Sequence, residues 1–237
     1  MKIAIVDDWS KSLRTLPCLA KLDNLDVTIL SDHISTIDDR IKQLSQFEAL
    51  VLIRERTQIT RALLQGLPKL KFISLFGNCP NIDIQACSDH RVLVCAGKRS
   101  YAPSFAAAEH TWALIMAAAK DIPQQMQNLQ NGKWQQGMAR GLFVNTSRSG
   151  LLGSGVLLSA INSGRHGKAA VDVFDEEPIT WQRDELACHP HIIATPHIGF
   201  VTDDEFEMQF SEVFEQVRSW ARGRPVNMLN PDIWQVA

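Results

Sequence analysis

Three short phrases between residues 141 and 199 decide the fold: Gly141-Leu-Phe-Val-Asn-Thr-Ser-Arg148, Asp172-Val-Phe-Asp-Glu-Glu-Pro178 and Ala194-Thr-Pro-His-Ile-Gly199. In each phrase a charged or titratable residue follows an apolar, β-like run, and these residues are Arg148, Glu177 and His197. The strands of a parallel sheet deliver their carboxyl ends to the same edge. We therefore expect a cation, a carboxylate and an imidazole to converge on one cleft.

The residues around these phrases predict the rest of an α/β unit. Strands are expected at Leu142–Asn145, Ala169–Phe174 and Ile192–Thr195, with a helix at Leu157–Asn162. A long, alanine-rich helix is expected from Ser104, as its N-cap, to Lys120. Beyond the third phrase, apolar residues recur at helical spacing from Thr202 until Gly223.

Residues 1–96 alternate between short apolar runs and amphipathic segments. The predicted strands are Lys2–Val6, Asp26–Leu30, Ala49–Ile53, Lys71–Phe76 and Val92–Cys95. The predicted helices are Ser12–Leu22, Ile37–Gln46, Thr60–Leu67 and Ile82–His90. Several of these strands are too apolar to have a solvent-exposed face, which, with the alternating helices, predicts a parallel sheet covered on both faces. Five such strands suggest a flavodoxin-like arrangement.

The composition is that of an ordinary globular protein. Of 237 residues, 45% are hydrophobic and 21% charged, and the net charge of −2 does not favour nucleic acid as a partner. The five cysteines form no C-x-x-C pair and are expected to be free thiols in a reducing compartment. The first apolar run is too short for a signal peptide, and Glu109 and His110 interrupt the most apolar segment, Ser104–Ala119. We therefore expect a cytoplasmic protein without a membrane span.

Each of the three titratable residues also has an ordinary structural interpretation. Arg148 could form a surface ion pair, Glu177 could belong to a solvated acidic turn, and a lone histidine such as His197 is usually structural. In the functional interpretation, the planar fork of an arginine binds a carboxylate at two points. A carboxylate beside an imidazole stabilises the protonated ring and fixes its tautomer, as a general acid/base requires. The three phrases in this order are far more specific than any one residue.

Two other kinds of site are weighed and set aside. Four side chains that bind metals lie within ten residues: Cys188, His189, His191 and His197. Their spacing matches no common zinc ligand pattern, and we expect no metal site. Val6-Asp7-Asp8 resembles the acidic pair of a receiver-type signalling domain, but Arg54 stands where that domain needs its phosphoacceptor aspartate.

Taken together, the three phrases resemble the D-isomer-specific 2-hydroxyacid dehydrogenase family. Further segments match this family's substrate domain in order: Leu52-Ile-Arg-Glu-Arg-Thr57, Leu67-Pro-Lys-Leu-Lys-Phe72, Gly77 with Asn81-Ile-Asp83, and Ala108-Glu-His110. Gly132-Lys-Trp134 fits the family's segment just before its nucleotide fold. Nearly the whole chain aligns with this pattern.

The resemblance implies a flavodoxin-like substrate domain at 1–101 and 201–237, and a Rossmann-type nucleotide-binding domain at 102–200. It also implies an oxidoreductase that transfers hydride between NAD or NADP and a small 2-hydroxy or 2-oxo acid. In the family's mechanism, His197 would exchange the hydroxyl proton, Glu177 would orient His197, and Arg148 would bind the carboxylate and polarise the carbonyl. Backbone amides near Arg54, Glu55 and Gly77 would help to bind the carboxylate. Thr146, Ser147 and Asp172 match the family's nicotinamide-side positions.

The chain departs from the family in one large respect. In the family, the Gly-Lys-Trp segment leads into a strand, a Gly-x-Gly-x-x-Gly turn and a helix. Here only residues 135–140 separate Trp134 from the Gly141 phrase. Roughly a hundred residues, about the first four strands of the Rossmann sheet, have no counterpart. Gly153-Ser-Gly155 does not replace the turn, because Leu158 occupies the third small position. Ser149, Gly153 and Ser154 also replace the family's usual glycine, aspartate and glutamate.

This gap predicts a truncated nucleotide-binding domain and impaired NAD(P) binding. The alternative is a non-catalytic remnant that acts as a small-acid binding or protein-interaction module. A three-stranded remnant leaves the edge of its first strand open to pairing. We therefore expect a homodimer, in which a partner subunit or the Ser104–Lys120 helix covers Gly141–Thr146.

Overall fold

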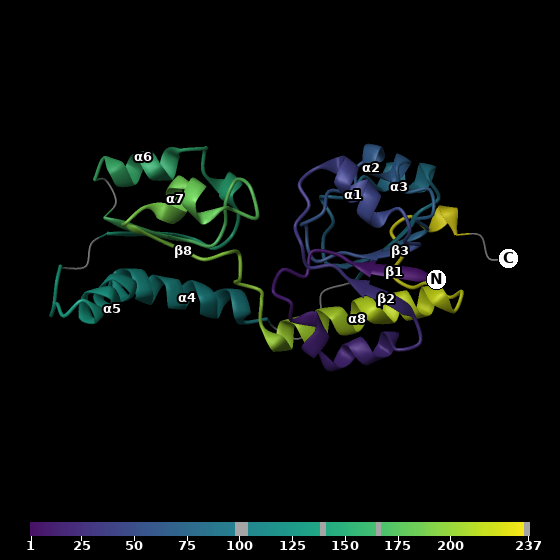
Figure 1. Cartoon of the computed structure of the whole chain (residues 1–237), viewed down its shortest axis with the longest axis horizontal. Coiled ribbons are helices and arrows are strands. Elements are labelled where there is room, and N and C mark those ends of the chain that lie inside the picture. Colours follow the sequence, from purple (N-terminus) through teal and green to yellow (C-terminus); the bar gives the residue numbers. More distant parts are fainter. Residues whose placement is uncertain (98–103, 138–140, 165–166, 235–237) are drawn as a thin grey trace. The chain divides into compact units, whose positions relative to one another are not determined.

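The chain folds into two compact units. The computed structural model describes residues 1–97, 104–137, 141–164 and 167–234. The first unit is formed by Met1–Pro103 with Asp203–Ala237, and the second by Ser104–Thr202. Each unit has its own parallel sheet with helices packed on it (Figure 1). The first unit is thus built from both ends of the chain, and the second is inserted between them.

The first unit contains a five-stranded parallel sheet in the order β2-β1-β3-β4-β5. Its strands are β1 (Lys2–Ile5), β2 (Asp26–Ile29), β3 (Ala49–Val51), β4 (Phe72–Phe76) and β5 (Leu93–Gly97). Every residue of β3, β4 and β5 is buried, as expected for strands covered on both faces. This strand order is that of flavodoxin-like sheets, and it confirms the predicted α/β class and arrangement.

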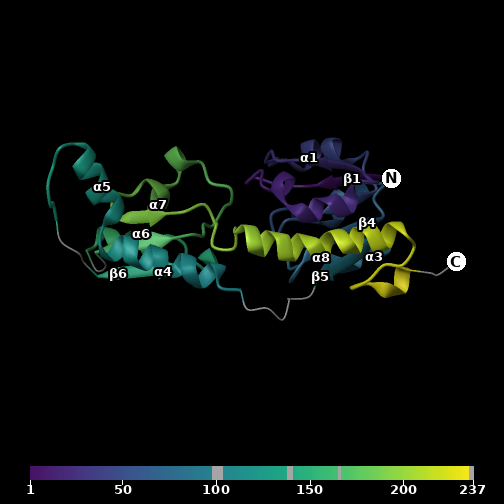
Figure 2. The same ribbon diagram turned by 90° about the horizontal axis from the view of Figure 1, so that it is seen from below.

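Helices cover both faces of this sheet (Figures 1 and 2). One face carries α1 (Ile37–Leu44), α2 (Arg61–Gln65) and α3 (Ile84–Asp89), which begin at the side-chain caps Thr36, Thr60 and Asp83. The other face carries α8 (Asp203–Ala221) and the 3-10 helix η2 (Pro17–Leu22). The ring of Trp220 on α8 stacks on Phe72 of β4 with 4.6 Å between centroids.

One predicted helix of this unit is wrong. The segment Ser12–Leu22 forms two short 3-10 helices, η1 (Leu13–Thr15) and η2, instead of one α-helix. Pro17 explains the break, because a proline ring disfavours helical geometry in the residue before it. Leu16 is accordingly extended, with φ −77° and ψ 128°.

The second unit contains a three-stranded parallel sheet in the order β6-β7-β8. Its strands are β6 (Leu142–Asn145), β7 (Lys168–Val171) and β8 (Ile192–Ala194). One face packs on α4 (Ala106–Ala119), which α5 (Ile122–Gln130) follows, and the other on α6 (Val156–Asn162) and α7 (Glu185–Cys188) (Figure 1). Three more 3-10 helices complete the described chain: η3 (Ser149–Leu151), η4 (Trp181–Arg183) and, in the first unit, η5 (Pro231–Ile233).

The long helix α4 covers one face of β6. Its side chains Leu114 and Ala118 pack on Ala170 of β7, with Leu142 and Val144 of β6 alongside. The expected cap is wrong: Phe105, not Ser104, is the N-cap, and it makes no side-chain cap hydrogen bond. The small alanine side chains of α4 allow it to approach the sheet closely.

Strand β6 forms one border of the sheet among the residues that the structure describes. The carbonyls of Gly141 and Asn145 accept hydrogen bonds from the amides of Lys168 and Asp172, both at 3.0 Å. The backbone groups of alternate residues point to opposite sides of a strand. Those of Leu142 and Val144 therefore point away from β7, toward the border of the sheet.

Candidate active site

The centre of the candidate site is a hydrogen-bonded pair, Glu177 and His197, in the second unit. Oε2 of Glu177 lies 2.6 Å from Nδ1 of His197, and the two side chains are 27% and 26% exposed. The other carboxylate oxygen, Oε1, accepts a hydrogen bond of 3.0 Å from the amide of Phe174. The carboxylate is therefore held from both sides, and the ring is oriented with Nδ1 toward it.

The surroundings of Glu177 favour its ionised form. Burial by itself raises the pKa of this carboxyl group. The hydrogen bonds from His197 and Phe174, and then the charges of His197 and Arg148, act in the opposite direction. The net result is that the pKa of Glu177 lies below its ordinary value. A carboxylate that stays ionised is suited to orienting an imidazole that gains and loses protons.

Arg148 belongs to the same constellation, since its charge acts on Glu177. Arg148 lies three residues after the end of β6, and its backbone is extended, with φ −147° and ψ 144°. Its Nη1 donates to the carbonyl of Ser147 at 2.8 Å. Glu177 and His197, which follow β7 and β8, are thus in direct contact, and Arg148, which follows β6, lies within range for its charge to act on Glu177.

The buried side chain of Asn145 fixes the turn that presents Arg148. Its Oδ1 accepts from the amide of Ser147 at 3.1 Å, and its Nδ2 donates to the carbonyl of Arg148 at 3.0 Å. Asparagine commonly closes turns in this way, because its side chain imitates a backbone amide. Asn145 is not among the site residues predicted from the sequence, although an asparagine at a strand end is a signal for such a turn.

The predicted nicotinamide-side residues lie at the ends of β6 and β7. The Thr146 hydroxyl is 2.7 Å from that of Thr111 on α4. The side chain of Ser147 is exposed, whereas Asp172 has 0% of its surface exposed. Both oxygens of Asp172 already accept hydrogen bonds from residues after β8.

The predicted substrate-binding residues Arg54, Glu55 and Gly77 belong to the first unit and lie at the carboxyl ends of β3 and β4. Arg54 and Gly77 both have left-handed backbones, with φ 55° and 85°. A Cβ added at Gly77 would come within 3.9 Å of Nη1 of Arg54, so the two residues are neighbours. Nε of Arg54 lies 4.0 Å from Oε2 of Glu55. Their convergence with Arg148, Glu177 and His197 on a common cleft stays a prediction.

The described residues contain neither a cluster suited to a metal ion nor a helix suited to a membrane. No three or more His, Cys, Asp or Glu side chains within the described ranges are arranged to hold a metal ion. In that same part of the chain, none of the helices has the length and apolar character that crossing a bilayer requires.

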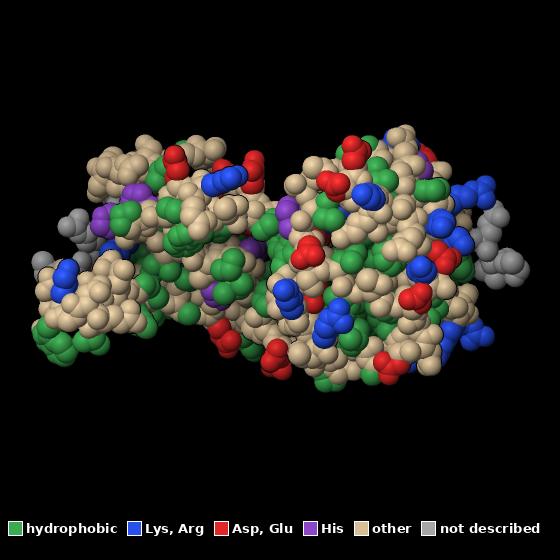
Figure 3. All heavy atoms as spheres, viewed as in Figure 1, with side chains coloured by type: hydrophobic (Ala, Val, Ile, Leu, Met, Phe, Trp, Pro, Cys, Tyr) green, Lys and Arg blue, Asp and Glu red, His purple; other side chains and the backbone are tan. Residues whose placement is uncertain are grey.

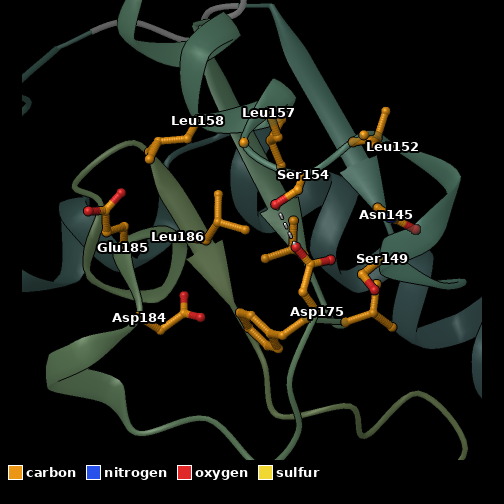
Figure 4. Close-up of a pocket in the computed structure, with 15 residues that line it drawn as sticks. Asn145, Ser149, Leu152, Ser154, Leu157, Leu158, Asp175, Asp184, Glu185 and Leu186 are labelled. Carbon is orange, nitrogen blue, oxygen red and sulfur yellow. Dashed lines mark hydrogen bonds between the residues drawn. The ribbon is translucent and has the colours of Figure 1, made fainter.

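A cavity of about 240 Å³ lies on the other side of the second sheet, between α6, α7 and the ends of β6 and β7 (Figure 4). Its lining is apolar near Leu157 and Leu186. Its polar groups include three carboxylates, those of Asp175, Asp184 and Glu185. The hydroxyl of Ser154, the position where the family usually has a glutamate, donates to Oδ2 of Asp175 at 3.3 Å. Like charges repel, so this cavity is a poor site for a phosphate or an acid substrate.

The sequence matches the family described as D-isomer specific 2-hydroxyacid dehydrogenase, catalytic domain, over residues 4–230. The chain is 29% identical to a D-3-phosphoglycerate dehydrogenase-type oxidoreductase of known structure from Ralstonia solanacearum. The match has a TM-score of 0.92 and covers 100% of this chain and 98% of that one. A phosphoglycerate oxidoreductase from Vibrio cholerae O395 is also 29% identical, with a TM-score of 0.86, over 94% of this chain and 99% of that one.

Curated relatives give the same family. D-3-phosphoglycerate dehydrogenase of Bacillus subtilis is 23% identical over 298 positions, which cover 86% of this chain and 56% of that protein. The chain spans about half the length of the curated relatives that it matches over most of its sequence. The family match over most of the chain agrees with the two parallel α/β units. It also agrees with the three sequence phrases that contain Arg148, Glu177 and His197 at the strand ends of the second unit. The chain belongs to the D-isomer-specific 2-hydroxyacid dehydrogenase family.

Proposed function

We propose that the chain is a D-2-hydroxyacid dehydrogenase by descent, which binds a small 2-hydroxy or 2-oxo acid and exchanges a proton with it at His197. The observation that carries this proposal is the 2.6 Å contact between Nδ1 of His197 and Oε2 of Glu177. A base oriented by a carboxylate is the arrangement that acid/base catalysis uses. Since Nδ1 faces Glu177, the other ring nitrogen, Nε2, is the one that would reach the substrate oxygen.

Arg148 is the proposed partner of the substrate carboxylate. Its guanidinium offers parallel N–H groups that match the two oxygens of a carboxylate, and in the same position it would polarise the 2-oxo group. Backbone amides near Arg54, Glu55 and Gly77 are proposed to contact the same carboxylate. The left-handed backbones of Arg54 and Gly77 support this, because such turns aim amide N–H groups outward.

The residues present fit only part of a nicotinamide dinucleotide. When bound, this cofactor supplies or accepts the hydride. Thr146 and Ser147 lie near the strand ends where a nicotinamide would be held, but both oxygens of Asp172 are occupied by protein donors. The sequence contains no Gly-x-Gly-x-x-Gly turn, so the pyrophosphate lacks the glycine turn and helix N-terminus that usually bind it. We therefore propose weak NAD(P) binding and derive no step through the nucleotide.

Calorimetry and turnover assays on the full chain test the dehydrogenase proposal. NADH and NADPH are titrated, and oxidation of each is followed with hydroxypyruvate, glyoxylate and phenylpyruvate. We expect weak nucleotide binding, slow turnover of at least one acid, and loss of that turnover in His197→Ala. Millimolar or absent binding without turnover would refute the dehydrogenase activity.

A second candidate function is a non-catalytic module that binds small acids or another protein. The alignment with the B. subtilis enzyme favours it, because 298 aligned positions exceed the 237 residues of the chain. That excess supports a loss of internal nucleotide-binding residues. Oxalate binding in the absence of nucleotide, abolished by Arg148→Ala but not by Arg183→Ala, would favour this module if no turnover is seen.

We also propose that the chain forms a homodimer. Large apolar side chains are exposed along α4 and α5 and just beyond them: Phe105, Trp112, Met116, Met126, Leu129 and Trp134. Figure 3 shows hydrophobic side chains gathered over α5 and the residues that follow it. Monomeric proteins rarely expose apolar patches of this kind. A second copy of the chain is the proposed occupant, because an isologous contact buries the same stripe on both copies.

A further inference from the structure

Asp172 is a buried carboxylate that holds the loop carrying His197. Its Oδ1 accepts from the hydroxyl of Thr195 at 2.5 Å and from the amide of Ile198 at 3.0 Å. Its Oδ2 accepts from the amide of Gly199 at 2.9 Å. These three donors flank His197 on both sides along the chain. The carboxylate therefore closes residues 195–199 into a turn around itself.

His110 on α4 adds a contact from a second element. Its Nε2 lies 3.1 Å from Oγ1 of Thr195 and 3.3 Å from Oδ1 of Asp172, and its side chain is 16% exposed. The hydroxyl hydrogen of Thr195 is directed to Asp172, so its oxygen is left to accept a hydrogen bond. This pattern requires that Nε2 of His110 carries a hydrogen. His110 thus connects α4 to the turn.

The loop conformation needs this support. His197 has φ 53°, a left-handed backbone that non-glycine residues adopt at a cost and keep only where the surroundings impose it. Gly199 packs directly on the same groups. A Cβ added there would lie 3.2 Å from Oδ2 of Asp172 and 3.4 Å from Cδ2 of His110. The contact with Asp172 is tighter than ordinary packing and the one with His110 is at the limit of ordinary contact, so a side chain at this position would press on the Asp172–His110 pair.

We infer that Asp172 and His110 are positioning residues, which hold the turn of residues 195–199 so that the ring of His197 meets Glu177. Neither residue needs to touch substrate or nucleotide for this role. The inference deepens the proposed function and rests on it, because positioning His197 matters for catalysis only if His197 exchanges a proton with the substrate. The positioning itself is a property of the folded chain and can be measured without turnover.

Nuclear magnetic resonance on the full chain tests the inference with His110→Ala and His110→Gln. Amide exchange of Ile198 and Gly199 reports on the turn, and the imidazole nitrogen signals of His197 report on its contact with Glu177. In His110→Ala we expect both amides to exchange at least about tenfold faster and the hydrogen-bonded Nδ1 signal of His197 to weaken. His110→Gln keeps an N–H donor at similar reach and should restore most of the protection.

Two controls separate positioning from general destabilisation. His90→Ala removes a histidine whose Nδ1 contacts the carbonyl of Ala86 on α3, in the first unit, and should leave His197 unchanged. Gly199→Ala should loosen the turn as His110→Ala does, whereas Gly150→Ala has no atom within 4 Å of the added Cβ and should not. Unchanged exchange of Ile198 and Gly199 in folded His110→Ala would overturn the inference, as would a His110→Gln variant that resembles alanine.

Turnover separates this inference from the proposed function. If the chain oxidises NADH with a 2-oxo acid, His110→Ala should lower kcat and leave KM nearly unchanged, because Arg148 is untouched. If the chain has no turnover but the turn loosens in His110→Ala, the dehydrogenase proposal fails and the positioning inference stands.

Discussion

At the scale of single residues, the charge of Glu177 determines how the site responds to acid. Its pKa in the folded chain lies below the ordinary value, so its ionised form contributes stability above the pKa of the unfolded chain. That contribution is lost as the pH falls through the lower, folded pKa. We expect Glu177→Gln to unfold with a weaker dependence on pH between about 5 and 3, as measured by urea unfolding across that range.

The neighbouring Glu176 provides the matched control for this measurement. Its side chain is exposed, and Glu176→Gln removes the same charge without the contact to His197. It should leave the acid limb of the stability curve close to that of the unchanged chain. Identical acid limbs for Glu177→Gln and the unchanged chain would show that the Glu177–His197 pair contributes nothing to stability.

The sequence predicted the three titratable residues but not the residues that hold them. Arg148, Glu177 and His197 each follow an apolar run. Such runs and their order along the chain can be read from the sequence alone. His110 and Asn145 act through contacts made across the fold or through a local turn. His110 lies 85 residues from its partner Thr195, and no local pattern encodes such a contact. That is why the positioning residues required the structure.

At the scale of elements, α8 has more buried residues than any other described helix. Phe214 is 0% exposed and lies with Phe206, Phe210 and Val217 on the buried face of α8. We expect Phe214→Ala to lower the free energy of unfolding by about 3–5 kcal/mol, because it leaves a cavity that the core cannot fill. Met208 on the same helix is only half-buried, and Met208→Ala should cost less than half as much. Equal losses in urea unfolding would contradict this assignment of the buried face.

The elements themselves were predictable where hydrophobic periodicity alone decides them. All eight strands of the described chain appear where apolar runs predicted them, and β6 has the predicted bounds, Leu142–Asn145. The failures lie at positions where one residue competes with the pattern. Pro17 divides the helix expected at Ser12–Leu22, and α4 begins after Phe105 instead of at a Ser104 cap. Helix ends depend on local hydrogen bonds that composition describes poorly.

At the scale of the whole molecule, the five cysteines should differ sharply in reactivity. Burial raises the pKa of the Cys18, Cys87 and Cys95 thiols to about 12, and it also raises that of Cys79. Cys188 is exposed. Since the thiolate is the reactive form, we expect one fast thiol with a disulfide reagent near pH 8 and five after denaturation. Cys188→Ser should remove the fast phase, and a second fast thiol in the native chain would contradict the full burial of Cys18, Cys87 and Cys95 or the partial burial of Cys79.

The exposed apolar side chains on α4 and α5, which include Trp112, Met116, Met126 and Leu129, form a stripe that the proposed homodimer would bury. The oligomeric state therefore tests this proposal directly. Trp112 and Met116 are 65% and 53% exposed and lie one turn apart on α4, while Leu114 and Ala118 face the sheet. A charge on the stripe should therefore disrupt association without touching the core. We expect light scattering to give twice the chain mass for the unchanged protein and the single mass for Trp112→Glu with Met116→Glu. Ile37→Glu on α1, where the side chain is 44% exposed, should remain dimeric. A monomeric unchanged chain at tens of micromolar would refute the homodimer and leave the stripe to another partner.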